Sequence, residues 1–521
     1  MLYENSNALI FTPPAHEPIM SKTKSSEAYP IIQGMKDFTE DKQYKKHCKI
    51  VATIGPASQD PQILEELICA GLDVARLNFS HGTEKNHAQT IEKIRQISKK
   101  LGKNVSILQD LQGPKIRCGQ LKNEQINIEK NKIYKLTFGN KQESNDVIPV
   151  DYNDLSKDIN LDEIIMMDDG LLSFKVIKIE GEEIEIIALN SGVLKSRKGV
   201  NFPNTQLTLP PLTEKDKKDL LFGVSQNVDA IALSFVRQAS DIKSCRKLLT
   251  TLGSDIPIIA KIEKTSAVEF IDDIAEESQG LMVARGDLGI EGKIEKVPGF
   301  QRKIIAAAQK NTIPVIIATQ MLESMIEAPK PTLAEINDVA NGVLEGADCV
   351  MLSGEVAAGK YPVECVKKMS SIIETVESWS LKTEKKQISF HKPHSSNNNA
   401  WQIHEAIAKS ACDAANSFNA KIIVCLTLTG SIARLISSWR PACPIVAISP
   451  RNDIVKRLLF SWGVYGFRNP LFYETDILLQ DLPLLLKSSN IVRSKDKIVI
   501  TAGVPMNSSV STNMIKITEI P

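Results

Sequence analysis

The sequence predicts an α/β protein with a (β/α)₈ TIM barrel, an inserted β-barrel lid domain and a C-terminal α/β domain. Three observations predict this class. Eight short apolar runs with polar ends alternate with stretches of helical periodicity between residue 47 and about residue 380. A long segment between the third and fourth runs alternates like antiparallel strands. A second alternation of helix and strand follows residue 400.

The eight apolar runs are the predicted barrel strands. They occupy residues 49–54, 74–79, 105–110, 230–235, 256–263, 280–287, 314–320 and 349–355. Helical periodicity between or after them predicts helices at 62–70, 85–101, 266–278, 300–310, 333–344 and 363–379. Strands joined by crossover helices lie parallel, so we expect all eight carboxyl ends at one edge of a closed sheet.

Nearly every predicted strand ends in polar side chains, which predicts a polar floor at the barrel mouth. These side chains are Thr53, Arg76, Asn78, Asp110, Ser234, Lys261, Glu263, Asp287, Thr319, Ser353 and Glu355. Ligand sites of such sheets lie at that edge. An ammonium beside two carboxylates, in Lys261, Glu263 and Asp287, suggests that a divalent cation and an anion bind together. The alternative is a structural ion pair that closes the barrel end.

The domain boundaries follow from changes in the pattern of apolar and polar residues along the chain. The barrel is expected at 47–114 and 211–380, and the lid at 115–210, with strands at 133–138, 171–179 and 183–189 and turns at 168–170 and 180–182. We expect 1–46 to be a disordered extension without assigned function and the polar segment 381–399 to be a linker. The C-terminal domain, 400–521, is expected to contain elements at 400–418, 421–427, 431–439, 444–449, 453–462, 497–501 and 513–520.

The composition excludes several classes of protein. The 521 residues carry a formal net charge of +1, so no bulk field points to nucleic acid or to a membrane surface. Nine scattered cysteines without a CxxC pair predict a reducing compartment and no structural zinc. No apolar run approaches ~18 residues, so no membrane span is expected. We therefore expect a cytoplasmic protein.

The chain resembles the pyruvate kinase family from about residue 47 to the C-terminus. The resemblance rests on ordered segments: Thr53-Ile-Gly-Pro-Ala-Ser58, Val74-Ala-Arg-Leu-Asn-Phe-Ser-His-Gly82, Asp110-Leu-Gln-Gly-Pro-Lys-Ile-Arg117, Asp168-Asp-Gly170, Lys261-Ile-Glu263, Met282-Val-Ala-Arg-Gly-Asp-Leu-Gly289, Ala318-Thr-Gln-Met-Leu-Glu-Ser-Met325 and Ala347-Asp-Cys-Val-Met-Leu-Ser-Gly-Glu355. It implies transfer of a phosphoryl group from phosphoenolpyruvate to ADP, giving pyruvate and ATP, the last step of glycolysis. A homotetramer is also implied.

The residues suit that chemistry. Glu263 and Asp287 are hard oxygen ligands, which suit a Mg²⁺ or Mn²⁺ ion shared with the substrate. Lys261 cannot be a metal ligand, and the resemblance implies that it faces the transferring phosphoryl and enolate oxygens. Arg76, and by resemblance Arg117, would bind phosphate through forked hydrogen bonds.

The resemblance also assigns the rest of the substrate and nucleotide site. Thr319 would lie near the methylene carbon that takes a proton, although a hydroxyl bonded to the sheet edge is the alternative. Arg285, Gly286 and Asp287 would hold the substrate carboxylate. The implied nucleotide contacts, besides Arg76, are Thr53, Pro56, His81 and Lys198. A structural histidine at 81 and a plain tight turn at Asp168 and Asp169 are the alternatives there.

The sequence predicts that K⁺ is not required. Most relatives hold a monovalent cation through oxygens equivalent to those of Asn78, Ser80, Asp110 and Leu111, and they carry glutamate in the following Gly-Pro-x-Ile-Arg segment. Here that segment is Gly113-Pro-Lys-Ile-Arg117, a form associated with independence from K⁺, as is the Leu111-Gln112 pair before it. The Lys115 ammonium would supply the missing charge, unless it points to solvent at the lid hinge.

A loop in the C-terminal domain is a candidate effector site. Thr427, Thr429 and Ser431 precede a predicted helix, and hydroxyls at a helix N-terminus can bind the phosphate of a sugar. A plain helix cap is the alternative. Residues 506–511 have no glycine where relatives carry glycine-rich loops, and Leu333 replaces an arginine found in relatives near the subunit boundary.

Two rival functions share parts of the pattern. One is another enolate-handling barrel enzyme, such as an aldol lyase, which would use the metal carboxylates but would not need ADP. The other is a catalytically inactive regulatory homologue, which would require a broken site. The presence of Arg76, Lys261, Glu263, Asp287 and Thr319 argues against the second rival.

Overall fold

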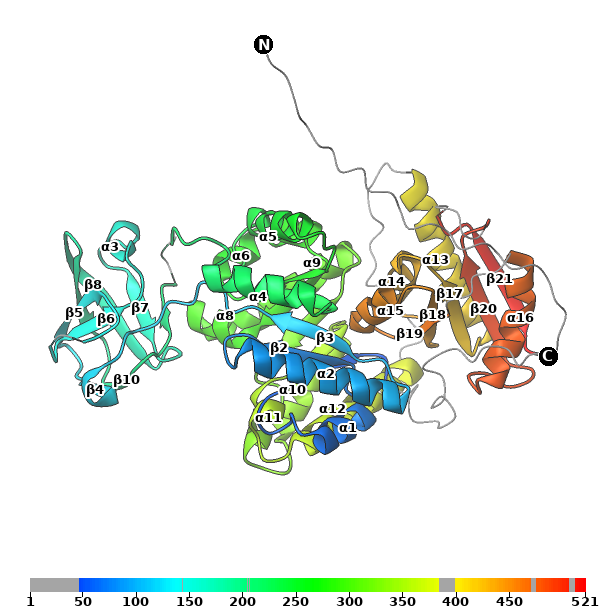
Figure 1. The fold of residues 1–521 in the computed structure, drawn as a ribbon, viewed down its shortest axis with the longest axis horizontal. Helices are drawn as coiled ribbons and strands as arrows, with labels where there is room; N and C mark the ends of the chain where they lie inside the picture. Colours follow the sequence, from blue (N-terminus) through cyan, green and yellow to red (C-terminus); the bar gives the residue numbers. More distant parts are fainter. Residues whose placement is uncertain are drawn as a thin grey trace, which may run out of the picture. The chain divides into compact units, whose positions relative to one another are not determined.

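The structure, a computed structural model, describes residues 46–142, 144–203, 205, 207–383, 399–469, 475–505 and 511–521. The expected extension, 1–46, and linker, 381–399, therefore lie almost wholly outside the described residues. Within the described part of the chain, no helix is long and apolar enough to cross a membrane. Figure 1 labels the helices and strands used below.

The predicted eight-stranded parallel barrel is confirmed. Its strands close in the order β1-β16-β15-β14-β13-β12-β3-β2. Every neighbouring pair is parallel. The strands are β1 (Lys49–Thr53), β2 (Val74–Asn78), β3 (Ser106–Asp110), β12 (Ala230–Leu233), β13 (Ile258–Ile262), β14 (Gly280–Ala284), β15 (Val315–Ala318) and β16 (Cys349–Leu352). All eight carboxyl ends therefore share one face of the barrel.

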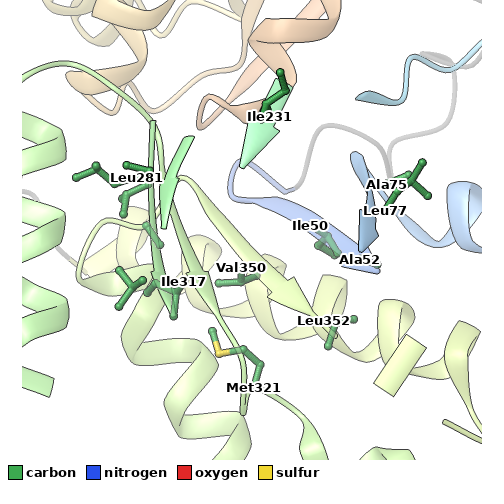
Figure 2. Packing of buried hydrophobic residues seen from close by; sticks show 14 of the residues in the cluster. Ile50, Ala52, Ala75, Leu77, Ile231, Leu281, Ile317, Met321, Val350 and Leu352 are labelled. Atoms are coloured by element: carbon green, nitrogen blue, oxygen red, sulfur yellow. The ribbon is translucent and has the colours of Figure 1, made fainter. Parts of the chain in front are cut away.

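The two faces of each strand pack in different places because successive side chains point to opposite sides. One set of strand residues packs outward with the surrounding helices, and Figure 2 shows several of them, including Ile50, Ala75, Leu281 and Val350. The alternate set fills the barrel interior: Val51, Val74, Leu108, Ala230, Ala232, Ile259, Met282, Ile316, Ala318, Cys349 and Met351. Every second residue of a strand points inward, so the polar residues that follow these rows at the strand ends also face the interior, at the barrel mouth.

The covering helices follow the strands. Those at Glu214–Ser225 and Ala239–Thr251 were not predicted from the sequence, and one predicted helix proves to be broken. The barrel helices are α1 (Pro61–Ala70), α2 (Glu84–Leu101), α4 (Glu214–Ser225), α5 (Ala239–Thr251), α6 (Thr265–Glu269), α7 (Ile271–Glu277), α9 (Val297–Lys310), α10 (Leu333–Leu344) and α12 (Pro362–Thr383). The single helix expected at 266–278 is broken at Phe270, whose φ of −101° and ψ of 21° leave the helical region. The apolar residues on both sides of the break are buried, so their spacing gave no sign of it.

The inserted segment forms a barrel-like β domain with its own core. Its larger sheet has the order β11-β7-β8-β9-β5-β6, and β10 and β4 form a smaller one. These strands are β4 (Gln125–Ile128), β5 (Ile133–Phe138), β6 (Val147–Val150), β7 (Ile164–Met167), β8 (Leu172–Glu180), β9 (Glu183–Ala188), β10 (Gly192–Lys195) and β11 (Val200–Asn201). Tyr134 and Phe174 meet edge to face in that core, with ring centroids 6.2 Å apart.

One buried carboxylate joins the two connections between the barrel and the inserted domain. Asp216, in the first turn of α4, accepts hydrogen bonds from Gly113 N at 3.1 Å and from Thr213 N at 2.8 Å. Gly113 has a φ of +69°, and a Cβ there would meet Phe235 and Ser234 within 3 Å. Only glycine suits both the backbone conformation and the close approach.

The C-terminal domain is the predicted α/β unit with a five-stranded sheet of order β19-β18-β17-β20-β21. It contains α13 (Asn399–Phe418), β17 (Ile422–Leu426), α14 (Ser431–Ser438), β18 (Ile445–Ser449), α15 (Asn452–Arg457), β19 (Val464–Arg468), α16 (Thr475–Ser488), β20 (Lys497–Ala502) and antiparallel β21 (Met514–Glu519). Sequence analysis missed β19 and α16. Strand β19 contains Gly466, and its neighbour Val455 leaves no space for a side chain there.

Candidate active site

Strand parity and register bring five predicted residues together at the barrel mouth. Thr53, Arg76, Asp110, Lys261 and Glu263 continue the inward-facing rows of their strands. In the sheet, Thr53 is the register partner of Arg76, and Asp110 is that of Asn78. Side chains that lie far apart in the sequence therefore become neighbours.

Asp110 is the anionic centre of this cluster. Its side chain is 1% exposed, Oδ2 lies 2.6 Å from Arg76 Nε, and Oδ1 lies 3.1 Å from Lys261 Nζ. Arg76 Nη1 also donates to Thr53 Oγ1 at 2.7 Å. Burial opposes ionisation of the carboxyl, but the two cations outweigh it and hold the pKa of Asp110 below its usual value. The predicted phosphate-binding Arg76 is thus oriented by a carboxylate.

Lys261 is buried and held as an ammonium. Its Nζ lies 2.9 Å from Glu263 Oε1 and donates to Ser234 Oγ at 2.7 Å. Burial alone would favour the neutral amine, yet the carboxylates of Asp110 and Glu263 raise the pKa of Lys261 above its ordinary value. The structural ion pair considered from the sequence is therefore present. It also fixes a charged group at the mouth of the barrel.

Glu263 and Asp287 supply carboxylate oxygens that suit a divalent cation. Burial, opposed by Lys261 and reinforced by the charge of Asp287, raises the pKa of Glu263 to about 7. A divalent cation between the two carboxylates would offset that repulsion. Glu263 Oε2 accepts a hydrogen bond from Phe235 N at 2.5 Å, which orients the side chain. The described residues contain no cluster of three or more His, Cys, Asp or Glu arranged for a metal.

Thr319 follows β15 in a left-handed backbone conformation. Its φ is +69°, and that of the next residue, Gln320, is +55°. The Thr319 hydroxyl accepts a hydrogen bond from Gly286 N at 2.9 Å. Thr319, which the resemblance places near the methylene carbon, is therefore in direct contact with the Arg285–Asp287 segment, which the resemblance places at the substrate carboxylate.

The side chain of Arg285 is used within the protein. Its Nη1 donates to both carboxylate oxygens of Asp338 at 2.8 and 2.7 Å, and its Nη2 donates to the carbonyls of Thr319 and Gln320 at 2.6 and 3.0 Å. Sequence analysis missed Asp338, because nothing in the helical pattern of α10 distinguishes it from an exposed acid. Ser234, seen only as a strand end, proves to be a direct partner of Lys261.

The candidate residues of the inserted domain make contacts within that domain. Arg117 Nη1 donates to the Arg197 carbonyl at 3.1 Å, and Lys198 Nζ lies 2.7 Å from Asp168 Oδ1. Both Asp168 and Asp169 have positive φ, as expected for a tight turn. Lys115 lies against Gly199, since a Cβ built on that glycine would be 3.2 Å from Lys115 Cε.

The remaining predicted positions lie around the ends of β1, β2 and β3. Asn78 Oδ1 accepts from Ser80 N at 3.1 Å, and the Leu111 carbonyl accepts from Ser234 Oγ at 2.6 Å. Pro56 and His81 are exposed. Glu355, expected at the polar floor, instead accepts backbone hydrogen bonds from Leu322 and Ser353.

The hydroxyl groups of the loop at the start of α14 form hydrogen bonds within the loop. Thr427 Oγ1 accepts from Gly430 N at 2.8 Å, and Thr429 Oγ1 lies 3.0 Å from Ser431 Oγ. The neighbouring Arg434 Nη1 approaches the Thr429 carbonyl at 3.4 Å. Leu333, the other noted departure, is 73% exposed at the start of α10. Residues 506–510 lie outside the described part of the chain.

Comparison with known proteins covers nearly the whole chain. Residues 45–366 match the family model described as "Pyruvate kinase, barrel domain", and residues 405–518 match "Pyruvate kinase, alpha/beta domain". The chain is 40% identical to pyruvate kinase 2 of Synechocystis sp. over 91% of this chain and 79% of that protein. It is 41% identical to the pyruvate kinase of Geobacillus stearothermophilus over 91% and 80%. The fold is similar to the crystal structure of a pyruvate kinase from Cryptosporidium parvum, with a TM-score of 0.85, 35% identity and coverage of 93% and 98%.

Proposed function

Because this chain belongs to the pyruvate kinase family, we propose that the cluster around Lys261 carries out the family's reaction. That reaction transfers a phosphoryl group from phosphoenolpyruvate to ADP and gives pyruvate and ATP. The observation that carries the proposal is the position of Lys261, an ammonium bonded to Asp110, Glu263 and Ser234 at the barrel mouth.

Lys261 and Arg76 stabilise the charge that moves during transfer. The phosphoryl group leaves the enol oxygen of the substrate and joins a terminal phosphate oxygen of ADP, and the enol oxygen keeps the electron pair of the broken bond. The two cations are already oriented by Asp110, so little reorganisation is needed at the moment of reaction. One preorganised donor of this kind is worth about 3–4 kcal/mol in a site with little water.

Glu263 and Asp287 would hold the Mg²⁺ or Mn²⁺ ion. Members of the family generally use Mg²⁺ and K⁺. The bound divalent ion would neutralise the substrate carboxylate and phosphate and stabilise the enolate. Burial is the main cause of the raised pKa of Glu263, and the charge of Asp287 adds to it. The second cause supports this role, because a cation between the carboxylates relieves their repulsion.

Thr319 and the turn at Arg285–Asp287 would handle the other end of the substrate. Backbone amides of this segment would receive the substrate carboxylate. Gly286 N holds the Thr319 hydroxyl, and the Arg285 side chain holds the carbonyls of Thr319 and Gln320. The Thr319 hydroxyl would lie close to the methylene carbon of the enolate and pass it a proton through water. That protonation completes pyruvate.

The nucleotide would be bound by residues from both the barrel and the inserted domain. Thr53 ends β1 and Pro56 follows it. Arg76 lies on β2 and His81 after it, and Lys198 belongs to the inserted domain. Closure of that domain on ADP would exclude water from the transfer. In this proposal Lys198 exchanges its contact with Asp168 for one with the nucleotide.

We propose further that Lys115 replaces the monovalent cation. The oxygens that would bind K⁺, on Asn78, Ser80, Asp110 and Leu111, gather at the ends of β2 and β3. Lys115 lies four residues beyond Leu111, at the boundary of the inserted domain. Asp110 already faces two cations, which favours a site that works without an added one.

A phosphorylated sugar remains the proposed effector of the Thr427–Ser431 loop. The hydroxyls of Thr427 and Thr429 precede α14 and that of Ser431 belongs to its first residue, and hydroxyls beside a helix N-terminus can bind phosphate. A homotetramer and a cytoplasmic location likewise stay predictions.

A coupled assay with phosphoenolpyruvate, ADP and Mg²⁺ tests the proposal. We expect pyruvate and ATP to form in equal amounts, with turnover abolished when either ADP or Mg²⁺ is left out. Pyruvate formation without ADP would favour an aldol-lyase-like enzyme. Failure of the folded protein to turn over would favour the inactive regulatory homologue.

A further inference from the structure

We propose that Asp338 is a positioning residue that acts through Arg285 to hold Thr319 in its reactive conformation. The inference rests on the proposed role of Thr319 in protonating the enolate. It begins with a conformational outlier, since Thr319 and Gln320 have φ values of +69° and +55°. A β-branched residue rarely adopts this region, and such conformations persist only where surrounding contacts enforce them.

The enforcing contacts come from one guanidinium. Arg285 Nε and Nη2 donate to the Thr319 carbonyl at 3.1 and 2.6 Å, and Nη2 also donates to the Gln320 carbonyl at 3.0 Å. Both carbonyls of the left-handed turn are therefore fixed by the same planar group. The orientation of the turn then depends on what orients the guanidinium.

Asp338 provides that orientation. Both of its carboxylate oxygens accept from Arg285 Nη1, at 2.8 and 2.7 Å. These two hydrogen bonds hold one end of the guanidinium while Nε and Nη2 face the carbonyls of Thr319 and Gln320. Asp338 lies on α10 and Arg285 begins α8 (Arg285–Glu291), so the contact joins two helices around the end of β15.

These contacts also determine where the hydroxyl of Thr319 lies. With the backbone turned to positive φ, Thr319 Oγ1 accepts from Gly286 N at 2.9 Å. That bond fixes the oxygen beside the turn that would receive the substrate carboxylate. Asp338 itself touches neither substrate nor metal in this arrangement. Its effect on the reaction would pass wholly through Arg285 and the Thr319 backbone.

The test compares two arginine–aspartate pairs in the full-length protein. Asp338→Asn removes the charge at the Arg285 pair, and Asp255→Asn does the same at the exposed pair with Arg457, whose distances are 2.6 and 3.1 Å. The readouts are kcat and its solvent isotope effect, KM for ADP, thermal unfolding as the check of folding, and exchange of the methyl hydrogens of pyruvate with D₂O. The last readout follows the protonation step alone.

We expect Asp338→Asn to lower kcat and methyl exchange at least tenfold, with a larger solvent isotope effect on kcat and little change in KM for ADP. Asp255→Asn should leave all of these within twofold. In a Thr319→Ala background, Asp338→Asn should lower kcat and methyl exchange by less than a further twofold, because the hydroxyl that Asp338 positions is absent.

Exchange within twofold of wild type in a folded Asp338→Asn protein would overturn the proposal. If that variant fails to fold, Asp338→Glu decides instead. The longer carboxylate displaces the guanidinium, so exchange should fall at least threefold, and a wild-type rate would overturn the proposal. Wild-type exchange in Thr319→Ala would contradict the proposed role of Thr319 itself. If exchange is impaired in Thr319→Ala but normal in Asp338→Asn, only the positioning role of Asp338 is refuted.

Discussion

At the scale of single residues, the site depends on charges that orient one another. Asp110 holds Arg76 and Lys261 at 2.6 and 3.1 Å, and Lys261 in turn lies 2.9 Å from Glu263. Each of these groups could be picked out from the sequence as the polar end of a strand. The pairing of Lys261 with Glu263 was considered from the sequence, but the pairing of Asp110 with Arg76 and Lys261 also depends on the order and register of the strands.

Lys115 gives the residue-scale prediction. With K⁺ replaced by tetramethylammonium at constant ionic strength, the wild-type protein should keep its turnover, because the ammonium supplies the single positive charge. Lys115→Glu should become dependent on K⁺. At ~4 Å and an effective dielectric constant near 20, one unit charge is worth on the order of 4 kcal/mol before desolvation. A wild-type rate that falls a hundredfold without K⁺ would refute the replacement.

At the scale of elements, α12 ties the start of β1 to the C-terminal domain. Glu377 on this helix accepts hydrogen bonds from His47 N at 2.7 Å and Cys48 N at 2.8 Å, and from Trp462 Nε1 at 3.0 Å. Burial opposes ionisation, but His47 and the backbone amides outweigh it and lower the pKa of Glu377. One buried carboxylate thus accepts hydrogen bonds from three donors in two separate segments.

Glu377→Gln should therefore lower stability near pH 7 by about 2 kcal/mol, because its amide NH₂ would face an N–H donor. A carboxyl whose pKa is lowered by folding stabilises the fold above its unfolded pKa and loses that contribution as pH falls through the folded pKa. The difference in thermal unfolding between wild type and variant should hence shrink below about pH 4.5. Glu364→Gln, at an exposed position of α12, is the control. A difference independent of pH would contradict this account.

At the scale of the whole molecule, the barrel was predictable and several of its details were not. Eight apolar runs with polar ends determined the strands, and their inward parity carried Thr53, Arg76, Asp110 and Lys261 to one face. The left-handed turn at Thr319 and its support by Asp338 depend on contacts between helices that no local pattern encodes. The break at Phe270 and strand β19 were missed for a related reason, since tertiary packing overrides local periodicity there.

The central claim is that the Lys261 ammonium stabilises phosphoryl transfer, and Lys261→Met tests it most directly. Methionine matches the stem of lysine and carries no charge, so binding of Mn²⁺, followed by electron paramagnetic resonance, should remain. Loss of about 3 kcal/mol of transition-state stabilisation predicts a fall in kcat of at least about a hundredfold. A folded Lys261→Met protein that binds Mn²⁺ and keeps more than about a tenth of wild-type kcat, a loss below about 1.4 kcal/mol, would contradict the claim.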